Sequence, residues 1–158
     1  MKFTIITIGK LKTAYLRDGV AEFVKRLGPY GGATIVELNE SKQSSQDASQ
    51  RAAIVEEEGQ RVLKQIANKG FVVLLDVKGK SLSSEELAAK IQRLEVEGTS
   101  EMTFVIGGAF GVSKELRQRA DLALSFSPMT FTHQMVRLLL VEQLYRACKI
   151  NRNEPYHW

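Results

Sequence analysis

The residue types best suited to chemistry gather at the carboxyl-terminal end of the chain. Both histidines, His133 and His157, lie there, and neither stands beside a cluster of cysteines or carboxylates, which argues against a zinc site. Arg137 follows His133 by four positions, and Arg146 follows Glu142 by the same interval, so each pair shares one face of a helix. The tail then alternates cations with aromatic rings through Lys149, Arg152, Glu154, Pro155, Tyr156, His157 and Trp158.

This interleaving suits a segment that faces RNA, because cations bind phosphate and rings stack on unpaired bases. A solvated, frayed terminus is the alternative that composition leaves open.

A glycine-rich turn is the second candidate site. Residues 103–120 read as a strand, a G-G-x-x-G turn (Gly107 to Gly111) and a helix that begins at Ser113, a good N-cap. The turn is not the G-x-G-x-x-G of a dinucleotide fold, and no Lys-Ser/Thr follows it as in a P-loop. The pattern therefore favours a turn whose backbone closes on a planar ligand over a phosphate cradle. A tight turn without a ligand is the remaining alternative.

A third candidate is the segment Phe126 to Gln134. Pro128 restricts Ser127 to extended backbone. Met129 and Phe131 are large apolar residues that neither helix nor strand periodicity explains. They suit the wall of a pocket for an aromatic ring, or else a loop plugged into the core.

These segments depend on a pattern of alternating strands and helices. Apolar runs predict strands at Phe3–Ile8, Thr34–Leu38, Phe71–Val77, Met102–Ile106 and Leu122–Phe126. Apolar stripes predict helices through Leu16, Val20, Phe23 and Leu27, through Val55, Gly59, Val62 and Ile66, and through Leu87, Ile91 and Leu94. Ser83 and Glu86 form a capping box before the third of these, and the polar stretch 40–50 reads as a loop.

The alternation predicts an α/β fold with a mainly parallel sheet flanked by helices. Ligands of such sheets bind outside the carboxyl ends of the strands. Three segments should share that edge: 76–83, 107–113 and 126–134.

The whole chain has the size and composition of one domain, residues 1–158. Hydrophobic residues make up 44% and charged residues 25%, and the net charge of +4 permits a polyanionic partner without requiring one. A single cysteine, Cys148, excludes an internal disulfide, fits a reducing compartment and reads as a packing residue. No segment reaches the ~20 apolar residues that span a bilayer, and the N-terminal apolar run is too short for a signal peptide. We therefore expect a cytoplasmic protein.

The last predicted helix, His133 to Ile150, is apolar around almost its full circumference. A helix of this kind must be buried, and in a small chain that usually requires a second subunit. We expect a homodimer with this helix in the interface; a central helix inside the monomer is the alternative.

Several stretches together resemble the ribosomal large-subunit methyltransferase H family of the SPOUT superfamily. They are FVIGGAFG (104–111), LALSFSPMTFTHQMVRLLLVEQLYRA (122–147) and PYH (155–157), with ITIGKLK (6–12) and KRLGPY (25–30) near the start. The resemblance spans essentially the whole chain. It implies a trefoil-knotted homodimer that transfers a methyl group from S-adenosylmethionine to N3 of a pseudouridine in large-subunit ribosomal RNA, on the assembled ribosome.

The resemblance also assigns residues. By motif, the cofactor would contact Leu75, Gly107, Phe126, Ser127, Pro128, Met129, Thr130 and Phe131. The glycine turn would then close on S-adenosylmethionine and not on a phosphate.

For the catalytic step, the implied target nitrogen must lose a proton, and an unperturbed histidine titrates near ~6.5. His157 is the candidate base or base-orienting group, with Tyr156 beside it. Arg137 and Arg146 are candidates for stabilising charge on the ring carbonyls or for binding phosphate. His133 is a further candidate, with a structural role in its loop as the alternative.

Three departures from the family pattern bear on these assignments. Ala109-Phe110 stand where Ser-Asn is common, Thr132 where proline is common, and Trp158 where a basic residue is common. The rival functions are a nicotinamide-dependent dehydrogenase, a non-catalytic ribosome-binding factor and a knotted methyltransferase that acts on transfer RNA. The absent G-x-G-x-x-G argues against the first.

Overall fold

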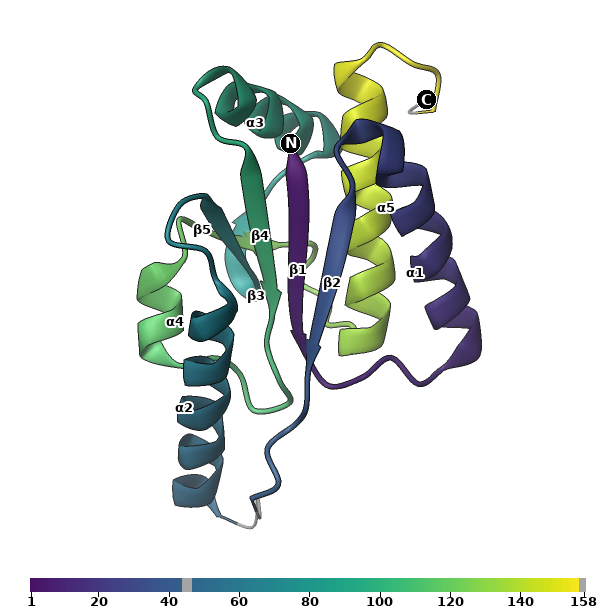
Figure 1. Ribbon diagram of the computed structural model, residues 1–158. Helices are drawn as coiled ribbons and strands as arrows, with labels where there is room; N and C mark the ends of the chain where they lie inside the picture. The colour runs from purple at the N-terminus through teal and green to yellow at the C-terminus, as the bar shows by residue number, and fades with distance from the viewer. Residues whose placement is uncertain (44–46, 157–158) are drawn as a thin grey trace.

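The computed structural model describes residues 1–43 and 47–156, and within them one sheet of five parallel strands is flanked by helices (Figure 1). The strand order across the sheet is β2-β1-β4-β3-β5. In chain order the elements are β1 (Lys2–Ile8), α1 (Ala14–Leu27), η1 (Gly28–Tyr30), β2 (Ala33–Leu38), α2 (Ala48–Gln65), β3 (Phe71–Ser81), α3 (Ser84–Val96), β4 (Glu101–Ile106), α4 (Lys114–Arg119), β5 (Leu122–Ser125) and α5 (His133–Asn151). The predicted α/β class and parallel sheet are confirmed.

The sheet is covered by helices on both faces, which is why its central strands are apolar on both sides. Side chains of β1 alternate between two clusters: Phe3 and Ile5 face α1, α3 and α5, whereas Ile6 and Ile8 face α2 and α4. Figure 1 shows the same division, with α5 beside α1 on one face and α2 beside α4 on the other. Because all five strands are parallel, the connections that follow them lie at one edge of the sheet.

Local capping interactions fix where the helices begin. The predicted box before α3 is present, because Ser83 and Glu86 each accept a hydrogen bond from the other's backbone N–H. A second box, Asp47 with Gln50, starts α2 at Ala48. The polar loop predicted to run to Gln50 is therefore too long, because the capping box turns its last residues into helix.

Strand β3 differs from its prediction. It continues to Ser81, whereas the apolar run predicted a strand that ends at Val77. Its pairing with β5 slips, because Leu75 and Lys80 both lie opposite Leu124. Residues 76–79 thus leave the ladder as a bulge while the strand direction is kept.

Helix α5 packs between α1 and α3 within a single protomer. One side is buried, through Leu140, Val141, Leu144, Ala147 and Cys148. Other apolar side chains, Leu138 and Leu139 among them, are only partly covered. Its apolar circumference is explained in part by the monomer, and the expected dimer stays a prediction.

Cys148 is a packing residue, as predicted. It belongs to the core cluster of α5, and burial raises the pKa of its thiol to about 11, so the thiol is not ionised near neutral pH. Among the described residues, no helix is both long and apolar enough to cross a membrane.

Candidate functional site

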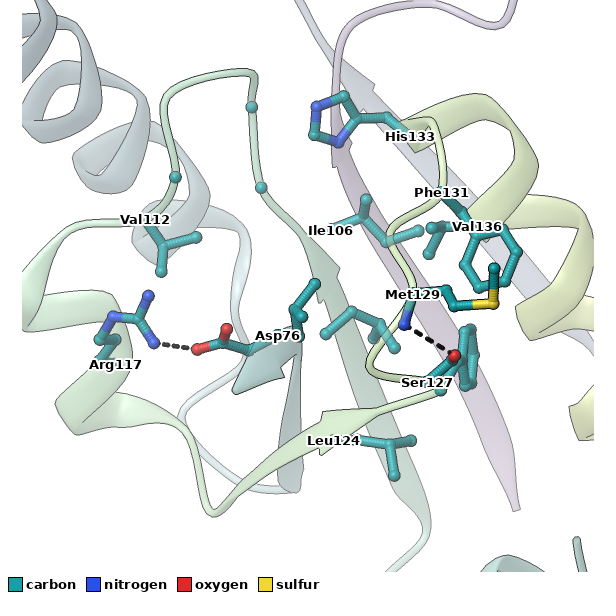
Figure 2. A pocket seen from close by; sticks show the side chains of 16 residues that line it. Asp76, Ile106, Val112, Arg117, Leu124, Ser127, Met129, Phe131, His133 and Val136 are labelled. Atoms are coloured by element: carbon teal, nitrogen blue, oxygen red, sulfur yellow. Dashed lines mark hydrogen bonds and ion pairs between the residues drawn. The ribbon is translucent and has the colours of Figure 1, made fainter. Parts of the chain in front are cut away.

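A pocket opens at the carboxyl edge of the sheet, between the three segments that the sequence placed there (Figure 2). Its wall comprises Leu75, Asp76, Val77, Ile106, Gly107, Gly108, Gly111, Val112, Arg117, Leu124, Phe126, Ser127, Met129, Phe131, His133 and Val136. The prediction that these segments meet is confirmed. Most of the wall is aliphatic, aromatic or bare glycine backbone, with a few polar groups, which is the usual character of a site for a small organic ligand.

The turn favours glycine for two reasons within the protein itself, which are packing at Gly107 and Gly108 and backbone conformation at Gly111. A Cβ on Gly107 would lie 2.5 Å from Cγ1 of Val112, and one on Gly108 would lie 2.5 Å from Oε2 of Glu58. Gly111 has a φ of +96°, a backbone angle that residues with a side chain rarely adopt. Its N–H donates to the Gly108 carbonyl at 3.2 Å. The turn is tight, and its backbone also faces the pocket.

The segment after β5 lines the pocket and is not plugged into the core. Met129 is 75% exposed and Phe131 is 45% exposed, so the alternative of a core plug is wrong. The Ser127 hydroxyl holds the segment's shape by accepting a hydrogen bond from the Met129 N–H at 2.9 Å. Pro128 and Thr130 are exposed and are not part of the pocket wall.

Two opposite charges meet in the wall, as the dashed line in Figure 2 shows. Nη1 of Arg117, on α4, donates to Oδ2 of Asp76 in the β3 bulge, and the Lys78 N–H donates to Oδ1 at 3.1 Å. Burial by itself would raise the pKa of the Asp76 carboxyl, but these hydrogen bonds outweigh it and lower the pKa below its usual value. Asp76 is therefore ionised at neutral pH.

Two of the departures from the family pattern can be placed. Thr132 caps α5, since its Oγ1 accepts a hydrogen bond from the Met135 N–H at 3.2 Å, and this positions His133 at the first turn beside the pocket. Phe110 is exposed on the turn, with the Arg51 guanidinium 5.4 Å from its ring centroid.

His133 is the one predicted catalytic residue, among those described, that lines this pocket.

Arg137 lies elsewhere. It is 2% exposed, and it donates to Oε2 of Glu37 at 2.7 Å and to the Gly9 carbonyl at 2.6 Å. It borders a different cavity, between α1 and β2. The helical spacing from His133 was correct, but the long side chain turns to the neighbouring strand and away from the candidate site.

Arg146 and Tyr156 come together further along α5. The Tyr156 hydroxyl donates to Oε1 of Glu142 at 3.0 Å, and the Arg146 guanidinium lies 4.9 Å from the Tyr156 ring centroid and pairs with the same carboxylate. Neither residue is part of the pocket wall. His157 and Trp158 lie outside the described residues.

Asp76 and Arg117 were not among the site residues predicted from the sequence. Asp76 carried a usable signal, because it directly follows the apolar run 71–75 near the edge where ligands bind. Arg117 carried none, since it reaches the pocket from a short helix 41 positions further along the chain.

Comparisons with known proteins agree with this arrangement. A family model described as "Predicted SPOUT methyltransferase" matches residues 1–157. Proteins named "Ribosomal RNA large subunit methyltransferase H" are 46% identical in Carboxydothermus hydrogenoformans, 47% in Halothermothrix orenii and 49% in Bifidobacterium adolescentis, each over 99% of both chains. A solved structure, "a probable methylase family protein from Haemophilus influenzae Rd KW20", shares the fold at 12% identity, with a TM-score of 0.52 over 99% of this chain and 70% of that one. The chain therefore belongs to the SPOUT methyltransferases and, within them, to the ribosomal RNA large subunit methyltransferase H family.

Proposed function

We propose that the protein methylates N3 of a pseudouridine in large-subunit ribosomal RNA, with S-adenosylmethionine as the methyl donor and the assembled ribosome as the substrate. The observation that carries this is the full-length family match together with a pocket built at the carboxyl edge by the three segments that the family motifs name. Because ribosomes work in the cytoplasm, we place the protein there. The family match removes the nicotinamide-dependent dehydrogenase from consideration.

The residues of the pocket fit S-adenosylmethionine. Aliphatic and aromatic side chains such as Ile106, Leu124 and Phe126 suit the adenine ring, and the bare backbone at Gly107 permits close approach. Asp76 and Arg117 offer both signs of charge to an amino-acid end. When bound, the cofactor would supply a methyl group on a positively charged sulfur.

The protein's own task is to hold the target base in line and to receive its proton, since N3 lies between two carbonyls and is not nucleophilic while protonated. We assign proton removal to His157, which follows Tyr156 in the sequence, and we assign to Arg146 the stabilisation of charge on the base or the binding of phosphate. Arg137 has a weaker claim, because Glu37 and the Gly9 carbonyl already engage it. His133 is proposed to orient groups at the pocket.

A homodimer reconciles these assignments with the geometry. Arg146 is 13 positions beyond His133 on α5, which corresponds to about 20 Å along a helix. Within one protomer, Arg146 therefore lies far from the end of α5 that borders the pocket. A second α5 lying antiparallel across a two-fold axis would bring the tail of each protomer to the pocket of the other.

A candidate surface for this contact lies next to the pocket. It is a cavity whose wall comprises Leu82, Ser83, Ser84, Leu87, Leu124, Phe126, Phe131, Leu139 and Gln143. Phe126 and Phe131 belong to both cavities, so a partner seated here would also complete the mouth of the pocket.

The test of the function is transfer of labelled methyl groups to ribosomes that lack the modification, with isolated large subunits and free RNA in parallel. We expect label on a pseudouridine of the large-subunit RNA, mainly in assembled ribosomes. His157→Ala should lower transfer at least about tenfold while cofactor binding persists. Label on transfer RNA would instead indicate a methyltransferase whose substrate is transfer RNA. Cofactor binding without any transfer would indicate a non-catalytic ribosome-binding factor.

A further inference from the structure

We propose that Asp76 and Arg117 form the receptor for the amino-acid end of S-adenosylmethionine, with Arg117 binding the carboxylate and Asp76 the ammonium group. This inference rests on the proposed function, because it assumes that the pocket holds that cofactor. It assigns the two residues as specificity determinants for a part of the ligand that takes no part in the reaction.

The charges of Asp76 and Arg117 complement those of the ligand. Among the described residues of the wall, Asp76 and Arg117 are the acidic and the basic side chain; the remainder are apolar residues, glycines, Ser127 and His133. The amino-acid end of the cofactor carries one negative and one positive charge. An ion pair in the wall is the complementary arrangement. Each of its two side chains can give up part of its contact with the other and bind the oppositely charged group of the ligand.

Both side chains also have hydrogen-bonding capacity to spare. A guanidinium has five N–H donors in a planar fork, and the contact with Asp76 runs through Nη1. A carboxylate offers about four acceptor sites, and Asp76 receives Arg117 and the Lys78 N–H. The side chains are 48% exposed for Arg117 and 14% for Asp76, so the guanidinium is open to a bidentate contact with a carboxylate.

Separate local features of the fold position the two side chains. Asp76 sits at the start of the bulge where β3 leaves its ladder, and bulges re-aim side chains beside binding sites. Arg117 is carried by α4, which begins at the buried N-cap Ser113. Helix α2 packs so closely there that a Cβ on Gly59 would lie 2.3 Å from the Ser113 Oγ. The start of α4 is thereby held against α2.

The pair should therefore contribute to the affinity for the ligand's amino-acid end and not to the affinity for its nucleoside. This is tested by calorimetric affinities for three ligands: S-adenosylmethionine, its decarboxylated analogue, and methylthioadenosine, which lacks the amino-acid end. Arg117→Gln should weaken binding of S-adenosylmethionine about tenfold or more and leave the decarboxylated analogue within about twofold. Asp76→Asn should weaken both amine-bearing ligands and leave methylthioadenosine unchanged.

Arg119→Gln is the matched control. Arg119 is on the same helix, but it pairs with Asp121 at 3.5 Å and donates to the Ala67 carbonyl at 3.3 Å, outside the pocket. It should bind all three ligands as the wild type does. Arg117→Lys keeps the charge without the planar fork and should give an intermediate loss.

Equal weakening of S-adenosylmethionine and its decarboxylated analogue in Arg117→Gln, or no weakening of either, would overturn the assignment. A loss of methylthioadenosine binding in Asp76→Asn would do the same, because it would point to damage of the pocket. If the wild-type protein binds no S-adenosylmethionine, the proposed function itself fails, and the assignment fails with it.

Discussion

The hydroxyl of Tyr156 donates a hydrogen bond to Oε1 of Glu142, 14 positions earlier in the chain, at 3.0 Å. The Tyr156 ring also meets the ring of Tyr145 edge-on, with centroids 4.9 Å apart. Arg146 pairs with the same carboxylate from the next turn of α5. The chain is thereby returned onto α5 as far as residue 156, so Glu142 fixes the position of Tyr156.

This contact predicts a pH dependence of stability. Burial, and then the hydrogen bond to Glu142, raise the pKa of Tyr156 above its ordinary value of 10.0. The folded state therefore holds the phenolic proton more tightly than the unfolded state. The resulting stabilisation is complete below about pH 10 and is lost as the pH rises through the folded-state pKa.

Chemical denaturation between pH 8 and about 11 would measure this effect, with Tyr156→Phe as the variant that has no phenolic proton. We expect the free energy of unfolding of the wild type to fall more steeply above pH 10 than that of the variant. Tyr15, an exposed tyrosine, supplies the control variant Tyr15→Phe, which should follow the wild type. Parallel curves for wild type and Tyr156→Phe would contradict the docking of this side chain.

A second prediction concerns the ion pair between Arg137 and Glu37, which are 2% and 37% exposed. Removing the carboxylate leaves a guanidinium charge in the core, whereas removing Arg137 leaves a carboxylate that water can reach. Glu37→Ala should therefore lower the free energy of unfolding by about 3 kcal/mol or more, and Arg137→Leu by less.

Equilibrium denaturation of both variants checks this order, with methyl transfer measured alongside. Glu37 also accepts a hydrogen bond from the Leu11 N–H at 2.7 Å. The loss of this bond in Glu37→Ala should lower the free energy of unfolding further. A fully stable Arg137→Leu variant that has lost methyl transfer but binds cofactor would favour a catalytic role for Arg137 instead.

A third prediction addresses the turn. In Gly107→Ala the new methyl group would overlap Val112, which itself lines the pocket. Cofactor affinity should fall about tenfold or more, and the double variant Gly107→Ala, Val112→Ala should recover part of it by giving the methyl group room. Gly28→Ala is the control, since a Cβ there has no neighbour within 4 Å. Calorimetry gives all four affinities; no recovery in the double variant would mean that the overlap is not the cause.

Much of the fold was predictable because its signals are local. The capping box of Ser83 and Glu86, and the apolar runs of β1 and β4, depend only on neighbours in sequence. The same local signal was available for Asp47 and Gln50 but was hidden in a polar stretch that reads as a loop. The edge shared by three segments also followed, since parallel strands end together.

The remainder depends on partners distant in sequence. The bulge in β3 exists because Leu75 and Lys80 both lie opposite Leu124, and a strand's own sequence does not specify its register with another strand. The contact of Arg117 with Asp76 and that of Arg137 with Glu37 join positions far apart in the chain. Membership in the SPOUT family likewise implies the trefoil knot, which neither composition nor periodicity indicated.

A fourth prediction tests the proposed dimer. Leu139 lines the cavity beside the pocket and is only partly buried in the protomer. A charge there should disrupt a contact between two α5 helices, because a carboxylate is costly to bury. Leu139→Glu should sediment as a monomer and lose methyl transfer. Val96, the last residue of α3, is 84% exposed, so the control variant Val96→Glu should behave as the wild type. A dimeric Leu139→Glu would move the interface elsewhere.

The last prediction separates a tail that acts on its own protomer's pocket from one that acts on its partner's. Gly107→Ala impairs the pocket and His157→Ala impairs the tail, so each variant alone should have low activity when the cofactor concentration is too low to fill the impaired pocket. If the tail serves the partner, a mixed dimer pairs one intact pocket with one intact tail. Random reassembly then restores about a quarter of wild-type sites, because half of the dimers are mixed and each holds one working site.

Methyl transfer by the two variants, mixed after reversible dissociation, measures this restoration. The control is a mixture of His157→Ala with the double variant Gly107→Ala, His157→Ala, which contains no intact tail and should stay inactive. Activity that remains at the level of the separate variants, although mixed dimers are demonstrated, would show that each tail serves its own protomer. We expect the restoration, because Glu142, where Tyr156 docks, is nine positions or about 14 Å along α5 from His133, and Arg146 is about 20 Å from it.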